Sequence, residues 1–174
     1  MTQVPKIRRE MKIRKMRKVA ILSLLLLIPL AVVAGVYAAR PTVSTNGTFT
    51  LTSQVKIGAS RIAGSNTIVM FKNNFSLAGP LNGHLVTLER DVIHNDTLTV
   101  NFHGRGTFTG STTAGKMGTL TINYVGRANS TDLWGQFTIL GGTAGLATLR
   151  GQGTFQGMGL GGTYTLRWHI APSA

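Results

Sequence analysis

The sequence predicts an all-β protein: an eight-stranded antiparallel closed barrel preceded by one N-terminal transmembrane helix or signal segment. Two observations predict the barrel. Apolar and polar residues alternate from Phe49 to Ile170, and all but one of the 22 glycines lie from Gly47 onward. Alternation with a period of two is typical of strands, and no stretch after residue 40 has a helical period. A charge-free apolar run near the N-terminus predicts the membrane segment.

The basic residues are concentrated at the N-terminus. Residues 1–18 hold eight of the 18 lysines and arginines and one of the five acidic residues, so they form a basic N-region. The other ten basic residues are scattered from Arg40 to Arg167, as on a solvated protein surface. They form no basic stripe interleaved with aromatic residues, so the net charge of +13 does not indicate a nucleic-acid partner.

Residues 19–39 form an uncharged apolar run that is long enough, as a helix, to cross the ~30 Å hydrocarbon core of a membrane. The basic region before it predicts a cytoplasmic N-terminus and a domain outside the cell membrane. The length of the run favours an uncleaved transmembrane signal-anchor over a signal peptide. Val36 and Ala38, with Pro29 late in the run, are instead typical of a signal peptide that is cleaved near Ala38, which would leave the domain secreted.

The rest of the chain divides into a short linker and one domain. Residues 40–46 are polar and contain Pro41, so they are expected to be the linker, and residues 47–171 are expected to form the barrel. The eight strands are expected at residues 48–57, 67–77, 83–94, 97–103, 117–127, 132–140, 150–157 and 163–170.

The predicted strands are joined by glycine-rich and Asn-rich turns. In the first strand the apolar residues expected to share one face are Phe49, Leu51, Val55 and Ile57. Turns are expected at Gly79-Pro80, Asn95-Asp96, Asn129-Ser130, Gly141-Gly142 and residues 159–162. Short turns make neighbouring strands antiparallel, and closing the sheet into a barrel removes its exposed edges.

A glycine followed two residues later by an apolar residue recurs along the domain. The motif is Gly-Thr-Phe-Thr at 47–50 and 106–109, Gly-Thr-Leu-Thr at 118–121, Gly-Thr-Phe-Gln at 153–156 and Gly-Thr-Tyr-Thr at 162–165. We expect it to mark strand beginnings, where glycine relieves a tight turn or a bend and the following apolar side chain returns to the core.

The glycine-rich segment 141–155, GGTAGLATLRGQGTF, followed by Gly-Thr-Tyr-Thr and a final apolar strand, resembles the C-terminal part of the allene oxide cyclase-like and dirigent-like barrel superfamily. The resemblance is strongest over residues 135–168. It implies an eight-stranded antiparallel barrel, often a homotrimer, with a pocket in the lumen for an apolar or aromatic small molecule. It implies no particular reaction, because no motif in this sequence matches the pocket acids of the family.

Three of the four acidic residues of the domain form a cluster: Glu89, Asp91 and Asp96. On a strand, Glu89 and Asp91 share a face, about 7 Å apart. If this face lines the lumen, one of the two carboxyl groups can hold a proton and act as a general acid. If it faces outward, which is the commoner arrangement, both are solvated charges beside cations of the neighbouring strands.

No cofactor is expected. The chain has no cysteine, and its histidines have no spacing typical of a metal site; they are His84, His94, His103 and His169. Four asparagines begin Asn-x-Ser/Thr sequences and are candidate glycosylation sites, three of them expected at strand ends or turns: Asn46, Asn74, Asn95 and Asn129.

The sequence supports three hypotheses for the function. The first is a binding module outside the membrane, whose lumen is lined by threonine and aromatic residues and holds a small apolar ligand without catalysis. The second is a structural or interaction module of the cell surface, with a barrel filled by its own side chains. The third is a dirigent-like or cyclase-like isomerase in which Glu89 or Asp91 acts as the acid.

Overall fold

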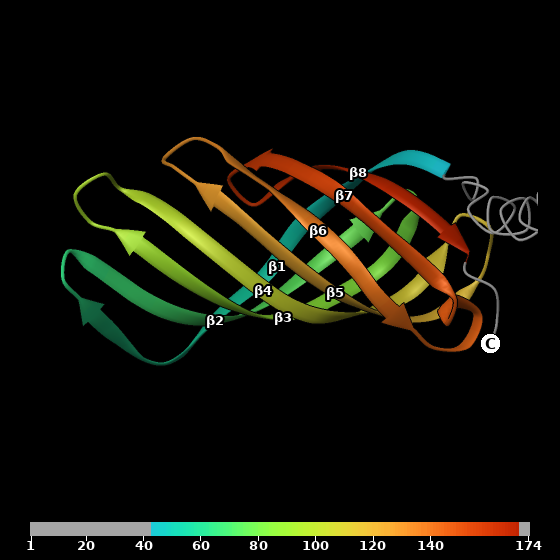
Figure 1. The fold of residues 1–174 in the computed structure, drawn as a ribbon, viewed down its shortest axis with the longest axis horizontal. Helices are drawn as coiled ribbons and strands as arrows, with labels where there is room; N and C mark the ends of the chain where they lie inside the picture. The colour runs from blue at the N-terminus through green and yellow to red at the C-terminus, as the bar shows by residue number, and fades with distance from the viewer. Residues whose placement is uncertain (1–42, 171–174) are drawn as a thin grey trace, which may run out of the picture. The chain divides into compact units, whose positions relative to one another are not determined.

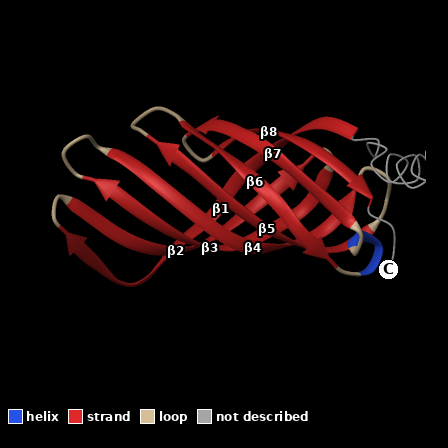
Figure 2. Ribbon diagram, in the orientation of Figure 1, coloured by secondary structure: helices blue, strands red, loops and turns tan. Residues whose placement is uncertain are grey.

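The computed structural model describes residues 43–170, which form eight strands and one short 3₁₀ helix (Figure 1). The strands are β1 (Val43–Ala63), β2 (Asn66–Ala78), β3 (Leu81–His94), β4 (Thr99–Thr112), β5 (Met117–Ala128), β6 (Leu133–Gly142), β7 (Leu149–Met158) and β8 (Gly161–Ile170), and the 3₁₀ helix η1 is Ala144–Leu146. Figure 2 shows that strands make up nearly all of this part of the chain. The prediction of an all-β domain is confirmed.

The eight strands form one antiparallel sheet that closes into a ring. Each strand pairs with the next one in the sequence, and β8 pairs with β1 from Thr50 opposite Gly161 to Val43 opposite Trp168. After Thr50, β1 separates from β8 and continues, paired with β2 alone, to Ala63. The predicted eight antiparallel strands and their closure into a ring are therefore both confirmed.

Two N-terminal predictions fall outside the described residues: the basic region 1–18 and the membrane segment 19–39. In the described range 43–170, no helix has the length and apolar character needed to cross a membrane. The predicted linker, residues 40–46, is wrong in its second half. Residues 43–46 belong to β1, because their backbone pairs with Thr165 to Trp168 of β8.

The predicted limits of six strands lie within two residues of the observed limits, and those of β1 and β4 do not. β4 continues to Thr112, since glycines interrupt its apolar alternation without interrupting its pairing with β3 and β5. The motif that was expected to mark strand beginnings also occurs inside strands, at Gly106 of β4 and Gly153 of β7. Gly141 and Gly142 end β6, and the turn follows them as residues 143–148 with η1.

A bulge at Thr52 reverses the faces of β1. Leu51 pairs with Phe75 and Ser53 pairs with Asn74, so one extra residue separates the two halves of the strand. Beyond the bulge, Val55 and Ile57 point outward and are 59% and 42% exposed. The prediction that both share a face with Phe49 is wrong, because each bulge residue shifts the alternation by one position.

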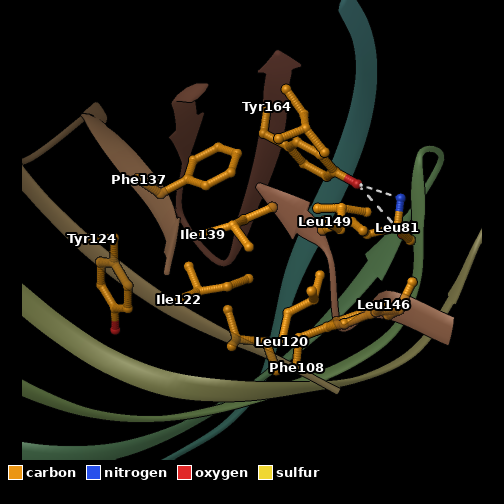
Figure 3. Close-up of a cluster of buried hydrophobic side chains, with 12 residues drawn as sticks. Leu81, Phe108, Leu120, Ile122, Tyr124, Phe137, Ile139, Leu146, Leu149 and Tyr164 are labelled. Atoms are coloured by element: carbon orange, nitrogen blue, oxygen red, sulfur yellow. Dashed lines mark hydrogen bonds between the residues drawn. The ribbon is translucent and has the colours of Figure 1, made fainter. Parts of the chain in front are cut away.

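One half of the ring interior, which we call the filled end, is packed with side chains (Figure 3). It lies beside the β2–β3, β4–β5 and β6–β7 connections, and its completely buried members are Leu81, Phe108, Leu120, Leu146 and Leu149. Leu146 comes from η1, so the short helix closes this end of the ring. Figure 3 shows the Tyr164 hydroxyl directed at Leu81, whose backbone N–H donates to it at 3.2 Å.

Glycines on the interior face lie directly opposite aromatic residues of the neighbouring strand. The five pairs are Gly47 with Tyr164, Gly104 with Tyr124, Gly126 with Phe102, Gly135 with Phe155 and Gly153 with Phe137. In each pair the ring covers the glycine so closely that a methyl group on the glycine would overlap ring atoms. The glycines are therefore needed for packing, in strands that glycine otherwise weakens.

We expect Gly104→Ala to lower the free energy of unfolding by about 1–3 kcal/mol, the usual cost of overpacking, because the ring of Tyr124 has to move. Denaturant titration followed by tryptophan fluorescence measures the change. Gly141→Ala is the matched control, since Gly141 is also a strand glycine but its added methyl group meets nothing nearer than the Arg150 guanidinium at 3.9 Å. Equal stability of the two variants would contradict this account of the glycines.

Candidate functional site

The other half of the ring interior, which we call the hollow end, contains a cavity of about 340 Å³. It reaches from Leu81 and Leu85, at the border of the filled end, to Leu133 and Leu160 beside the β5–β6 and β7–β8 turns. Leu160 is 66% exposed, so the cavity extends to a rim in contact with solvent. Its size lies within the range of small-molecule sites.

Aromatic side chains surround the cavity as one connected belt. The belt consists of Phe49, Phe75, Phe102, Tyr124 and Phe155. Successive rings meet edge to face, such as Phe49 and Phe75 at 6.3 Å and 72°, while Phe102 stacks on Phe155 at 6.1 Å and 30°. None of the described residues that line the cavity is a threonine, so the expected threonine lining is wrong. Thr87 points inward, but the other strand threonines near the belt point outward.

Glu89 and Asp91 both point into this cavity, from neighbouring inward positions of β3. Of the two arrangements open from the sequence, the structure has the one in which their face lines the interior. Leu81, Leu85 and Thr87 occupy the earlier inward positions of the same strand and are buried. Asp96, the third residue of the acidic cluster, lies instead in the exposed β3–β4 turn, where it accepts a hydrogen bond from Thr97 N–H.

A network of buried polar groups holds the Glu89 carboxylate. Asn73 of β2 donates from Nδ2 to Glu89 Oε1 at 2.7 Å, and its side chain is 1% exposed. The Tyr124 hydroxyl of β5 also reaches Glu89. Thr87 Oγ1 lies 2.9 Å from the hydroxyl oxygen of Tyr124. The Thr87 hydroxyl can donate to Tyr124 in this hydrogen bond, which leaves the Tyr124 proton free to be donated to Glu89. Two strands, β2 and β5, thus deliver donors to a single carboxylate.

Burial raises the pKa values of both carboxyl groups. For Glu89 the hydrogen bonds from Tyr124 and Asn73 oppose the effect of burial, and so does the charge of His103 on the outer side of β4. For Asp91 nothing opposes it: burial and then the negative charge of Glu89 raise the pKa to about 7. The two groups are hydrogen-bonded to each other and titrate as a coupled pair, in which Asp91 is partly protonated near pH 7.

Asp91 has fewer partners than its neighbour. Its Oδ1 is buried without a hydrogen-bond partner among the described residues, and so is Asn73 Oδ1. Burial and the charge of Glu89 also raise the pKa of Tyr124, so its hydroxyl stays protonated as a donor. None of the described residues that line the cavity is a lysine, arginine or histidine. The site therefore has an excess of acceptors and of negative charge.

The structure does not bring the histidines together. His84 and His103 lie on the outer face, and His94 bridges Asn66 and Asn101 with both ring nitrogens at 2.8 Å. Across residues 43–170 no three metal-ligating side chains converge. The site acids gather instead with Asn73, Thr87 and Tyr124, which the sequence does not single out, because their proximity depends on the pairing register of β2, β3 and β5.

The four candidate glycosylation sites all lie outside the ring interior. Asn95 and Asn129 are exposed in the β3–β4 and β5–β6 turns, as expected. Asn46 and Asn74 lie within β1 and β2, where Asn46 accepts a hydrogen bond from Thr165 and Asn74 donates one to Ser53. Asn46 was expected at a strand end, but the extension of β1 to Val43 places it inside the strand.

The fold and the site define a class of protein: an antiparallel ring that is filled at one end and hollow, aromatic and acidic at the other. No protein-family model matches the sequence, and no curated protein is similar to it. Among solved structures, a protein of unknown function of the DUF3224 family from Shewanella oneidensis has a similar fold, with a TM-score of 0.65, 11% sequence identity, and coverage of 76% of this chain and 100% of that one. These comparisons give no support to the allene oxide cyclase-like resemblance.

We expect the protein to become less stable as the pH rises from about 4 to about 7. Asp91 has an ordinary pKa of 3.8 when unfolded and about 7 when folded, so in this range the folded protein binds a proton that the unfolded chain has lost. Asp91→Asn removes this proton and should flatten the profile. The measurement is the difference in unfolding free energy between wild type and variant at each pH, so that the contributions common to both proteins cancel. A difference that does not change with pH would disprove the assignment.

Proposed function

We propose that the hollow end of the ring binds a small, largely apolar molecule, and that binding is the function of the domain. The observation that carries the proposal is the cavity of about 340 Å³ enclosed by the aromatic belt. A closed barrel of eight strands has an interior just wide enough to be filled by side chains or to hold one small ligand. The filled end shows that this chain packs the first way where its side chains allow it.

The layout of the belt supports the same proposal. Three of its five rings, those of Phe102, Tyr124 and Phe155, lie over glycines of the neighbouring strands, which draws them toward the wall of the ring and away from the axis. Leucine or isoleucine at the glycine positions would occupy the space instead. An apolar molecule that enters this cavity gains contact with ring faces and edges. Every Å² of apolar surface that it buries there favours binding by ~25 cal/mol.

The sequence outside the described residues adds a location to the proposal. The basic N-region and the apolar run 19–39 support a domain held at the outer face of the cell membrane, or released there after cleavage near Ala38.

A homotrimer rests on the family resemblance alone and is not part of the proposal. The unfilled interior also counts against a module whose barrel serves only as a structural block.

A second function deserves a test because of Asp91. A carboxyl group with a pKa of about 7, inside an apolar cavity and beside Glu89, has the properties of a general acid for isomerising a bound molecule. We expect no such conversion. Molecules that co-purify with the Glu89→Gln/Asp91→Asn double variant are to be extracted from it and incubated with the wild-type protein. An isomerase would return a compound of equal mass and different chromatographic retention, and a binding protein returns the compound unchanged.

We expect Ala128→Trp to abolish uptake of a neutral apolar probe, phenylnaphthylamine. Ala128 lines the cavity from β5, and an indole there occupies the space of the ligand. Thr107→Trp is the matched control, since it adds the same indole to the exposed outer face of β4. Probe fluorescence is compared among the full-length proteins at one detergent concentration, so that uptake by detergent cancels. Equal fluorescence for wild type and Ala128→Trp would disprove binding in the cavity.

A further inference from the structure

We infer that the molecule bound in the hollow end carries a positive charge: it is an apolar compound with a protonated amine, and the amine binds Asp91 and Glu89. This inference rests on the proposed function, because it specifies the ligand of the same cavity. It follows from three features of the described residues: an excess of acidic groups, hydrogen-bond acceptors without donors, and aromatic faces placed beside the acids.

The first feature is the charge of the lining. Glu89 and Asp91 are the charged residues that line the cavity, and both are acidic. The cations of the described residues are elsewhere: Lys56, Arg61, Lys72, Arg90, Arg105, Lys116, Arg127, Arg150 and Arg167 are absent from the lining. Buried charges in proteins are normally paired with an opposite charge. The partner of this pair is therefore a group that enters the cavity from outside.

The second feature is the set of unused acceptors. Glu89 receives hydrogen bonds from Asn73 and Tyr124, but Asp91 Oδ1 and Asn73 Oδ1 have no donor among the described residues. Leaving such a group unpaired costs about 1–3 kcal/mol, and more when it is charged. A protonated amine supplies up to three N–H donors and no acceptor. A ligand carboxylate, phosphate or carbonyl would add acceptors where donors are missing.

The third feature is the aromatic corner beside Asp91. Phe102 lies directly opposite Asp91 in the β3–β4 pairing, and its ring centre is 6.2 Å from that of Tyr124 at an interplanar angle of 59°. Cations bind the faces of aromatic rings within about 6 Å of the ring centre, most strongly where water is excluded. The ammonium group thus has carboxylates on one side and ring faces on the other, and the rest of the ligand extends along Phe155 and Phe49.

The charged ligand changes the protonation of the acid pair. Near neutral pH, Asp91 is partly protonated, and an entering ammonium ion displaces that proton to the solvent. Affinity for the amine therefore rises with pH until Asp91 is fully ionised. The groups that face the pair are Asn73 on β2, Tyr124 on β5 and, through β4, His103 on the outer face. Because the charge of His103 acts on Glu89, His103→Gln is the control for this pH dependence.

The test compares two probes of nearly equal shape, naphthylmethylamine, which is a cation below pH 9, and neutral naphthylmethanol. Binding to the full-length protein is measured by calorimetry at pH 8, with Ala128→Trp as the blank. We expect the amine to bind about tenfold more tightly than the alcohol, the effect of one charged hydrogen bond. In the Glu89→Gln/Asp91→Asn variant the amine should lose about this factor, and the alcohol should bind as before. Circular dichroism confirms that the variant is folded.

Two further measurements test whether the amine displaces the proton from Asp91. The affinity of wild type for the amine should rise between about pH 5.5 and 8, and His103→Gln should keep most of that rise. At pH 7 the binding heat should depend on the ionisation enthalpy of the buffer, because a proton is released.

The outcomes separate the two proposals. If both probes bind equally and Ala128→Trp abolishes both, the cavity binds ligands and the inference of a cation is wrong. If the double variant leaves the affinity for the amine unchanged, the inference is also wrong. If neither probe binds in a way that depends on Ala128, the proposed function itself fails, and the inference fails with it.

Discussion

The ring depends on the packing of aromatic rings over glycines of the adjacent strand. Glycine is a poor strand former, and a side chain on the wall of a narrow ring competes with its neighbours for the same space. Pairing one glycine with one aromatic residue resolves both problems, as in Gly104 with Tyr124 and Gly153 with Phe137, because the ring replaces the missing side chain and covers the exposed backbone. The rings consequently lie along the wall, and the axis of the hollow end stays open.

The same packing divides the charges of the domain. The cations point outward or lie at the ends of the ring, whereas Glu89 and Asp91 are surrounded by aromatic and aliphatic side chains. Water and salt screen the outer charges, but the inner pair is screened far less. The electrostatic character of the interior is therefore negative although the domain as a whole is basic. The net charge of the chain, which reflects its surface and its N-terminus, says little about the chemistry of its cavity.

Much of this fold follows from local patterns in the sequence. The alternation in β8 places Tyr164 and Leu166 inside, and the Asn95-Asp96 turn ends β3, as the sequence predicts. The bulge at Thr52 was not predictable, since it depends on how β1 pairs with β2 beyond the end of β8. The sequence also places Glu89 and Asp91 on one face without showing which face it is. Asn73 and Tyr124 are missed entirely, because only the register of three strands brings them to Glu89.

The position of the acids is nevertheless a consequence of the core. Leu81, Leu85, Glu89 and Asp91 occupy alternate positions of one strand, so they all face the same way. A shift of one residue that turned the acids outward would also move Leu81 and Leu85 from the interior to solvent, and each of those leucines stabilises the ring by roughly 1.5–3 kcal/mol. The burial of the leucines thus holds the acids in the cavity against their preference for water. A complementary cation bound there, as we propose, would recover part of that cost, because a ligand that binds only the folded state stabilises it.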